Sequence, residues 1–509
     1  MSRARIALLA VLLACPLGAA TRYDISSGPL QDTYVDPVNG SDGNSGASRS
    51  GALRTLTEAW NRIPRGTPLA TGHRILMMAG RHGESTLPNY MEERYGTAAA
   101  PIIIQSADAS RSARLAGDLN IFDVRYLYLI GLDMRPDPAG DVLHCEKCDH
   151  LLVRESNLDG GDRQAHEVVK INQSQHVFIE DSTLSGADDN TIDFVAVQYG
   201  HVIGNRISDA QDWCMYAKGG SAYLTVEGNE IFDCGTGGFT AGQGTGFQFM
   251  TPPWIHYEAY DVKVVNNVIH DTEGAGLGVN GGYDILLAYN TLHRVGTRSH
   301  MLEVTYGARS CDGVPGDEGR ERCQQYLALG GWGTTVIDDG TNYVRIPNRN
   351  VFVYDNLLYN PPGFVSPQIF TIAGPFEDVV ADANLQIRGN VIFNGGESIG
   401  VGDGSGCAPS NPTCNETQIL ADNTINQFEP EVGGDLRPRA NSNLLTARAF
   451  AIPDFTWDDA PRPPLAPAGR LENRVTTDRD GTLRATPSVP GAYTTGAAIR
   501  PARRRSVRH

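Results

Sequence analysis

Residues 202–231 read VIGNRISDAQDWCMYAKGGSAYLTVEGNEI and contain one phrase twice, as Asn205-Arg-Ile207 and Asn229-Glu-Ile231. In each copy alternating apolar residues precede the Asn, which is followed by any residue and then Ile or Leu. A fixed period of this kind is typical of a stacked solenoid. Other copies, two with Ser in place of Asn, are Ser156-Asn-Leu158, Ser182-Thr-Leu184, Asn267-Val-Ile269, Asn290-Thr-Leu292, Asn356-Leu-Leu358, Asn390-Val-Ile392 and Asn423-Thr-Ile425.

The spacing of these copies predicts the fold. Closely spaced neighbours are 23 to 26 residues apart, and longer intervals indicate inserted loops. Short β-branched runs with period-two alternation, such as Val262–Val265 and Val351–Tyr354, predict strands, whereas helical spacing is nearly absent. Asn suits the corner of each coil, because it tolerates a left-handed backbone and hydrogen-bonds the next Asn. The pattern predicts an all-β, single-stranded parallel β-helix; leucine-rich repeats share the period but carry more leucine.

The two ends differ from the repeats. Residues 1–20 have a basic start, an apolar run and a small-residue cleavage site, which predicts a signal peptide; the alternative is lipidation at Cys15. Thr55–Ile63 predicts an N-terminal cap helix. We therefore expect a signal at 1–20, a β-helix with its cap at 21–430, and a closing segment with a basic, flexible tail at 431–509. No segment is apolar over the ~20 residues that a membrane-spanning helix needs.

Eight cysteines remain once Cys15 is assigned to the signal. An even number in an exported chain favours disulfides. We expect local pairs, Cys214 with Cys234, Cys311 with Cys323 and Cys407 with Cys414. Cys145 and Cys148 have the spacing of a redox pair or half a metal site, but without a second such motif a structural disulfide is favoured.

The net charge of −17 argues against nucleic acid as a partner, because phosphate binding needs a basic face. An acidic chain that handles an anionic glycan needs local Lys and Arg or a bound cation. We expect a secreted or periplasmic monomer.

Two segments resemble a known family. Tyr34-Val-Asp36, with Asn39–Asn44 and Leu53–Leu56, resembles the entry segment of pectate-lyase-like right-handed parallel β-helix proteins, which include calcium-dependent polysaccharide lyases. Thr477–Gly481, with Arg484 and Gly491-Ala-Tyr493, resembles their closing segment. The resemblance spans nearly the whole chain and implies a right-handed coil that acts on or binds an extracellular polysaccharide. Since the superfamily also contains hydrolases, epimerases and adhesive proteins, it specifies the fold better than the activity.

Residues at equal offsets from the corner form columns along a solenoid. Four residues after the corner stand Asp209, Asp233, Asp271 and then Arg294. Carboxylates on three adjacent coils are hard oxygen ligands, so they predict a calcium (Ca2+) site. The alternative is that each Asp caps a turn, for which its backbone preference suits it.

A second column predicts the groove. Lys218, Gln243 and Asn280 each stand beside glycine, which lets a bulky chain approach the backbone closely. The insertion that follows Gln243 is rich in aromatic residues, whose faces suit sugar rings. We expect the substrate to contact Gln243, Trp254, Tyr257, Asn280, Arg298 and Glu303.

β-Elimination on a uronate needs a cation for the carboxylate, a base for the neighbouring proton and an acid for the leaving oxygen. Calcium, Arg294 or Arg298 would supply the first. Lys218 would be the base, as in the resembled lyases that use lysine or arginine. A histidine would be the acid, with His270, His293 and His300 as candidates. The alternative is that Lys218 pairs with an Asp and that each His is structural.

Two other functions stay open. Hydrolysis needs two carboxylates at a spacing set by the mechanism. A non-catalytic glycan-binding β-helix needs neither the lyase groups nor a pair of catalytic carboxylates, and its polar columns are ladders and turns. The two enzyme readings require Lys218, the His and Arg group and the acids to converge in one cleft, which we expect near residues 205–305. Candidate carboxylates for hydrolysis are Asp212, Asp233, Glu258, Asp271, Glu273 and Glu303.

Overall fold

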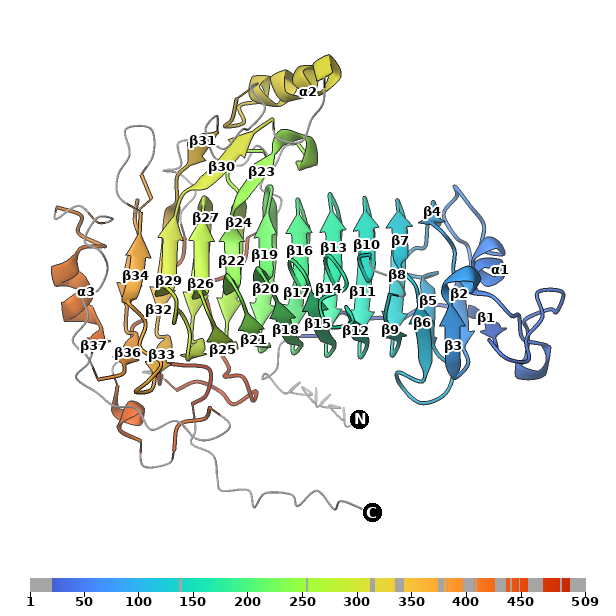
Figure 1. The fold of residues 1–509 in the computed structure, drawn as a ribbon, viewed down its shortest axis with the longest axis horizontal. Coiled ribbons are helices and arrows are strands. Elements are labelled where there is room, and N and C mark those ends of the chain that lie inside the picture. Colours follow the sequence, from blue (N-terminus) through green and yellow to red (C-terminus); the bar gives the residue numbers. More distant parts are fainter. Residues whose placement is uncertain are drawn as a thin grey trace, which may run out of the picture.

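The computed structural model shows a long coil of short strands with an inserted lobe at one side (Figure 1). No helix of its described residues is long and apolar enough to span a membrane. The structure describes residues 21–136, 140–252, 255–311, 316–334, 343–373, 380–381, 383–396, 407, 410–425, 436–439, 442–447, 449–455, 470–485 and 488–494. The expected signal peptide and most of the basic tail lie outside these residues.

Three long sheets, named A, B and C here, make up the coil. Sheet A contains β1 (Leu30–Val35), β2 (Gly72–Met77), β5 (Ile102–Ser106), β8 (Arg125–Ile130), β11 (Asp149–Arg154), β14 (Gln175–Glu180), β17 (Gln198–Ile203), β20 (Ser221–Glu227), β24 (Ala259–Val265), β27 (Gly282–Ala288), β32 (Arg349–Tyr354) and β35 (Gln386–Arg388). Sheet B contains β3 (Gly80–Gly83), β6 (Ala113–Ala116), β9 (Asp133–Met134), β12 (Asn157–Asp159), β15 (Thr183–Ala187), β18 (Arg206–Ala210), β21 (Glu230–Cys234), β25 (Val268–Thr272), β28 (Thr291–His293), β33 (Leu357–Asn360), β36 (Val391–Asn394) and β37 (Thr424–Ile425). Sheet C contains β4 (Met91–Glu92), β7 (Leu119–Phe122), β10 (Leu143–Glu146), β13 (Val169–Asn172), β16 (Ile192–Val195), β19 (Trp213–Lys218), β22 (Gly237–Gly242), β26 (Ala275–Asn280), β29 (His300–Thr305) and β34 (Gln368–Ile372).

Each coil contributes one strand to each sheet, in the order C, A, B, and pairs in parallel with the next coil. Successive strand residues alternate between the two faces, so Met215 and Ala217 point into the core while Tyr216 and Lys218 point outward. The inward Ile, Leu and Val side chains form one continuous apolar core along the coil. The predicted all-β parallel coil is confirmed.

The corner between sheets A and B carries the predicted asparagine ladder. The side-chain oxygen of Asn229 accepts from both the backbone N and Nδ2 of Asn205, at 2.9 and 3.1 Å. The same pair of bonds joins Asn267 to Asn290 and continues through the later corners to Asn423. These bonds pair buried backbone groups that the turn leaves without a strand partner, and so they stabilise the corner.

Helices lie at the ends and in the insertions. α1 (Leu56–Asn61) occupies the predicted stretch, and Thr55 Oγ1 accepts from Glu58 N at 3.0 Å. That α1 caps the solenoid stays a prediction. α2 (Gly316–Ala328) and α3 (Glu416–Asp422) were not predicted. The short 3-10 helices are η1 (Arg49–Gly51), η2 (Glu84–Thr86), η3 (Phe247–Phe249) and η4 (Asn443–Thr446).

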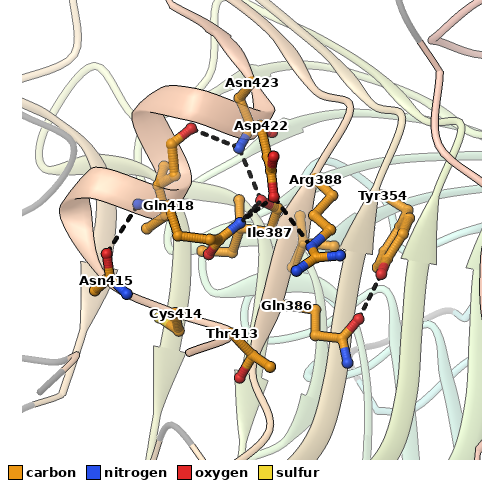
Figure 2. A network of polar contacts seen from close by, with 12 residues as sticks. Tyr354, Gln386, Ile387, Arg388, Thr413, Cys414, Asn415, Gln418, Asp422 and Asn423 are labelled. Atoms are coloured by element: carbon orange, nitrogen blue, oxygen red, sulfur yellow. Dashed lines mark hydrogen bonds and ion pairs between the residues drawn. The ribbon is translucent and has the colours of Figure 1, made fainter. Parts of the chain in front are cut away.

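α3 lies at the last corner of the asparagine ladder (Figure 2). Nδ2 of Asn423 donates to the carbonyls of Ile387 and Ile419, at 2.8 and 2.9 Å. Arg388 pairs with Asp422 at 3.2 Å, also drawn in Figure 2. The ladder therefore ends against a helix, which satisfies its last amide.

Four disulfides have the predicted local connectivity: Cys145–Cys148, Cys214–Cys234, Cys311–Cys323 and Cys407–Cys414. Cys214 and Cys234 belong to β19 and β21 of one coil. Cys311 and Cys323 lie in the longest insertion, where their bond joins the chain after β30 to α2.

Two insertions build a small separate sheet from β23 (Gly244–Gly246), β30 (Gly307–Ser310) and β31 (Val344–Ile346). β23 follows β22, whereas β30 and β31 follow β29, so the sheet joins insertions of different coils. Glu258 and Arg309 form an ion pair with both side chains fully buried beneath it. Glu258 also accepts from Gly219 N at 3.0 Å, which fastens this lobe to the end of β19.

The C-terminal segment lies against the coil along the edge shared by sheets A and B. Arg484 donates to Asn266 at 2.7 Å, and Gly491 N donates to the carbonyl of Asp355 at 2.8 Å. Asp478 closes the segment on itself by accepting from the backbone of Thr482 and Thr494, at 2.9 Å each. The segment that resembles the family's closing element is thus docked on the coil.

Candidate active site

The outer face of sheet C carries a continuous column of polar residues. Lys170, Asp193, Tyr216 and Thr240 are Cα partners in the successive strands β13, β16, β19 and β22. The same column reaches Glu303 in β29. Because neighbouring strands lie about 4.8 Å apart, side chains of adjacent coils in this column can contact each other.

Lys170 lies between two carboxylates. Its Nζ donates to Oε1 of Glu167 at 2.8 Å and lies 3.6 Å from Oδ2 of Asp193. Glu167 and Asp193 are 1% and 3% exposed, while a quarter of the Lys170 side chain reaches solvent. The buried acids therefore hold an ammonium at the surface of the sheet.

The environment sets the protonation of this group. Burial lowers the pKa of Lys170, but Asp193 and Glu167 outweigh that effect and raise it, so the ammonium keeps its proton. Burial and a hydrogen bond to Asp141 raise the pKa of Glu167. Burial and the Asp193 charge also raise the pKa of Tyr216. The cluster contains a permanent cation, a carboxyl that titrates at higher pH than usual, and a neutral phenol.

Asp193 has an unused acceptor. Its Oδ1 is buried and has no hydrogen-bond partner, while Oδ2 faces Lys170. Most buried polar atoms in proteins are paired, since an unpaired one costs about 1–3 kcal/mol. The Tyr216 hydroxyl contributes a hydrogen-bond interaction with Asp193, so this carboxylate belongs to the network that holds Lys170 and Tyr216 on the sheet.

Lys218 extends the cluster at the end of β19. Its ammonium lies 4.1 Å from the centre of the Tyr216 ring and donates to Oε1 of Gln243 at 2.8 Å. No carboxylate of the described residues is ion-paired with it. Lys170 and Lys218 thus share one face but differ in their partners. We call Glu167, Lys170, Asp193, Tyr216, Lys218 and Gln243 the sheet C cluster.

Three other predicted residues lie further along the same face. Asn280, in β26, donates to Oε1 of Glu303 at 3.1 Å, and Nε2 of His300 lies 2.8 Å from Oε2 of Glu303. The expected column of Lys218, Gln243 and Asn280 is nearly correct. Asn280 pairs with Gly242 in register, and Gln243 is the next residue.

His270, Arg294 and the acid column lie on sheet B instead. His270 contacts Asp271 at 2.7 Å and Glu230 at 3.3 Å, and Arg294 donates two hydrogen bonds to Asp271. Burial lowers the pKa of His270, but these carboxylates raise it overall. The predicted set of Lys218, His270 and Arg294 therefore does not converge in one cleft, as the expected active site required, and a reaction on sheet C needs other partners for Lys218.

The predicted calcium ligands are engaged with arginines. Asp209 pairs with Arg163 at 2.8 Å, and Asp271 pairs with Arg294. Burial and the Asp271 charge raise the pKa of Asp233. Asp209, Asp233, Asp271 and Arg294 all have φ between 54° and 58°, so the backbone is left-handed at this position of each coil. Turn capping by the Asp side chains stays a prediction. Calcium binding there stays a prediction.

Two groups in the described part of the chain bring three ligand atoms within 4.8 Å of one another: Asp149, His150 and His176 on sheet A, and Asp141, His166 and Glu167 beside Lys170. The Asp209, Asp233 and Asp271 column is not such a group there. In the second group Glu167 already accepts from Lys170, so a metal ion would compete with the ammonium.

The remaining predicted contacts have other surroundings. Tyr257 is fully buried and packs against Tyr283 and Trp332, so its ring has no open face for a sugar, and this prediction is wrong. Arg298 pairs with Glu273 at 3.5 Å at the exposed turn before β29. Trp254 lies outside the described residues.

The sequence analysis missed Glu167, Lys170 and Asp193. His144, Lys170 and Asp193 each stand twelve residues before a corner, at Ser156, Ser182 and Asn205. The acid column was found by counting forward from the corner. Counting backward as well would have found this column.

Comparison with known proteins agrees with the fold. A family model described as a right handed beta helix region matches residues 141–309. The matched stretch lies within the coil and agrees with the parallel β-helix that the structure shows. No curated protein sequence matches this β-helix chain. Among solved structures, a rhamnogalacturonan lyase is 12% identical with a TM-score of 0.44, covering 71% of this chain and 87% of that chain.

Two further solved structures are similar to this β-helix. The pectate lyase Pel9A is 14% identical with a TM-score of 0.40, covering 88% of this chain and 97% of that one. A GH136 lacto-N-biosidase from Eubacterium ramulus is 11% identical with a TM-score of 0.39, covering 77% and 67%. At these identities the similarity concerns the fold alone.

Proposed function

We propose that this β-helix is an exported polysaccharide lyase that cleaves a uronate-containing glycan on the outer face of sheet C. The observation that carries the proposal is the Lys170 ammonium, held at the surface by Glu167 and Asp193. A fixed cation on the floor of a sheet suits the carboxylate of an acidic sugar. The four disulfides support an exported chain.

The two lysines suit different steps. Lys170 keeps its proton and would neutralise the uronate carboxylate, which makes the neighbouring C–H more acidic. Lys218 is held by a neutral amide and a phenol ring, and neither of these contacts is an ion pair that fixes its proton. We assign Lys218 as the base, in neutral form, that removes this proton while the C–O bond to the leaving sugar breaks.

Calcium is a further part of this proposal, at Asp209, Asp233 and Asp271. Because these residues lie on sheet B, a bound ion there would stabilise the coil or hold a distant part of the glycan.

Hydrolysis is the second candidate, favoured by a specific observation. Glu167 and Asp193 both lie within 3.6 Å of one ammonium, and the raised pKa of Glu167 is the property of a general acid. The near-complete burial of both acids speaks for a supporting role and makes elimination the first choice.

The experiment is to incubate the purified protein with a panel of uronate polysaccharides and neutral glycans, with calcium or with chelator. Ultraviolet absorbance detects the unsaturated uronate ends of elimination, and a reducing-sugar assay detects either reaction. Absorbance that rises with the native protein and not with Lys218→Ala supports the lyase. Reducing ends without absorbance support hydrolysis. Neither signal on any glycan overturns both reactions.

A further inference from the structure

A pocket of about 370 Å³ adjoins the sheet C cluster. Its floor contains Glu146 and Asn172, which are Cα partners in β10 and β13. Asn172 is two residues beyond Lys170 in the same strand and therefore points to the same face. Two residues of extended chain span about 7 Å, so the pocket lies one step along β13 from Lys170, which does not itself line it.

The roof of the pocket comes from both insertions. η3 supplies Gln248 and Phe249, and α2 supplies Arg322 and Tyr326. Figure 1 shows α2 standing out from the coil beside β23 and β30. Gln173 Nε2 donates to the carbonyl of Gln248 at 3.5 Å, which joins the floor to the roof. The coil and the inserted lobe thus enclose the space together.

Three buried polar atoms at this pocket have no hydrogen-bond partner: Asn172 Oδ1, Gln248 Nε2 and Gln248 Oε1. Together they offer two acceptors and one amide donor. Sugars carry hydroxyls that donate and accept, so one sugar unit would satisfy both kinds of atom once the Asn172 and Gln248 side chains turn toward the pocket. An apolar ligand would leave these three polar atoms unpaired, and their desolvation would stay uncompensated.

The aromatic rings and the charged residues of the pocket indicate which class of ligand it binds. Phe249 is 47% exposed and Tyr326 is partly buried, so both can offer ring faces, as sugar-binding sites do. Lys147 and Arg322 supply two cations against the single carboxylate of Glu146, in a chain of net charge −17. A local excess of positive charge in an acidic protein favours an anionic ligand.

We propose that this pocket is a subsite for one uronic-acid unit of the glycan, next to the unit held at Lys170. The inference rests on the proposed function and adds the substrate class at a defined place. Arg322 binds the carboxylate, Asn172 and Gln248 bind hydroxyls, and Phe249 covers a ring face. The inserted lobe, and not the coil alone, then determines which glycan binds.

The test is calorimetric titration with short oligogalacturonate and oligomannuronate, and with a neutral cello-oligosaccharide of the same length. Arg322→Ala and Phe249→Ala are each expected to weaken uronate binding about tenfold. Arg320→Ala, on the same helix, and Tyr90→Ala, on an exposed aromatic of the N-terminal coils, are the matched controls and are expected to bind within about twofold of native. All four substituted residues are exposed, so thermal unfolding should stay near native.

The same titrations separate the pocket from the reaction. Lys218→Ala is expected to bind the oligouronate but not to turn it over. If oligouronate binding depends on Arg322 but no glycan is turned over, the subsite proposal holds and the lyase proposal is wrong. Turnover with unchanged KM in Arg322→Ala overturns the pocket and leaves the lyase. Equal affinity for the neutral sugar, or no binding of either oligouronate, also overturns the pocket.

Discussion

Lys170 Nζ donates a 2.8 Å hydrogen bond to Oε1 of Glu167, a carboxylate that is 1% exposed. A partly exposed ammonium is thus fixed by a buried acid in the adjoining turn of the same coil. If the Lys170 side chain moved away, the buried Glu167 carboxylate would lose the ammonium that compensates it. This fixed orientation is what a substrate-binding cation needs and what a freely moving surface lysine lacks.

Lys170→Met is expected to lower turnover of the uronate glycan about a hundredfold, because it removes the cation opposite the developing charge. It also removes one side-chain partner of buried Glu167 and leaves His166, so it lowers stability as well. Lys170→Met combined with Glu167→Gln removes the charge as well and is the control for stability. Turnover near the native value in a folded Lys170→Met protein contradicts the assignment.

Lys218→Ala is expected to abolish the rise in ultraviolet absorbance, a loss of about 10²–10⁴, which is the usual contribution of a general base. Gln243→Ala removes only the amide that positions Lys218, so its effect should be smaller and mostly on kcat. Steady-state kinetics across a pH range measure both. A Lys218→Ala enzyme with an unchanged rate and pH profile would falsify the role as base.

Arg294→Ala is expected to tighten calcium binding at the acid column about tenfold, because it removes the Arg294 ion pair from Asp271 and leaves only His270 on Oδ2. Calorimetric titration of calcium into the native and variant proteins measures the change. Asp233→Asn, which removes the middle carboxylate, should weaken binding in either background. No calcium signal in the native protein and the Arg294→Ala variant rules out the column as a calcium site.

Asn290→Ala is expected to destabilise the protein by about 3 kcal/mol, since it removes the ladder bonds of the Asn290 side chain and leaves buried groups unpaired. Asn61→Ala, at the exposed end of α1, is the matched control and should change stability by less than about 0.5 kcal/mol. Urea unfolding gives both values. Equal stability of the two variants would mean that the asparagine ladder does not contribute to the free energy of unfolding.

Asp355 makes the docked C-terminal segment sensitive to pH. Burial raises the pKa of this fully buried carboxyl to about 7, and Phe450 N donates to it at 2.9 Å. The folded state therefore keeps a proton that the unfolded state has lost above about pH 4, so stability falls as pH rises from about 4 to 7 and is then level.

Limited proteolysis and thermal unfolding near pH 5 and near pH 8 test this dependence. The segment around Phe450 should be cut faster at the higher pH. Asp355→Asn keeps an uncharged acceptor for Phe450 N and should flatten the difference. A native protein that is cut at the same rate at both values contradicts the expectation.

The fold was predictable because its signal repeats. Each corner Asn is needed for a turn and a ladder bond, so the same residue returns in coil after coil, and the disulfides follow from local spacing. The residues of the sheet C cluster are not required by the turn of each coil, so their residue types do not repeat along the sequence. Lys170, Asp193 and Tyr216 differ in residue type, and only their shared register brings them together.

The insertions were the least predictable part. Tyr257 looked like an exposed aromatic because nothing in the local sequence shows that β31 and Trp332, from a later insertion, cover it. Arg309 likewise meets Glu258 across fifty-one positions, a contact between two loops that no period connects. Contacts of this kind depend on how inserted loops fold back, which the repeat does not specify.

The small sheet of β23, β30 and β31 has a consequence for how this molecule can diverge. Its strands come from two loops on different coils. Because β23 pairs with β30, each loop supplies the hydrogen-bond partners for a strand of the other. A homologue that shortened one loop would leave an open strand edge on its counterpart. The two loops should therefore lengthen, shorten or disappear as a pair, while the coil beneath them stays unchanged.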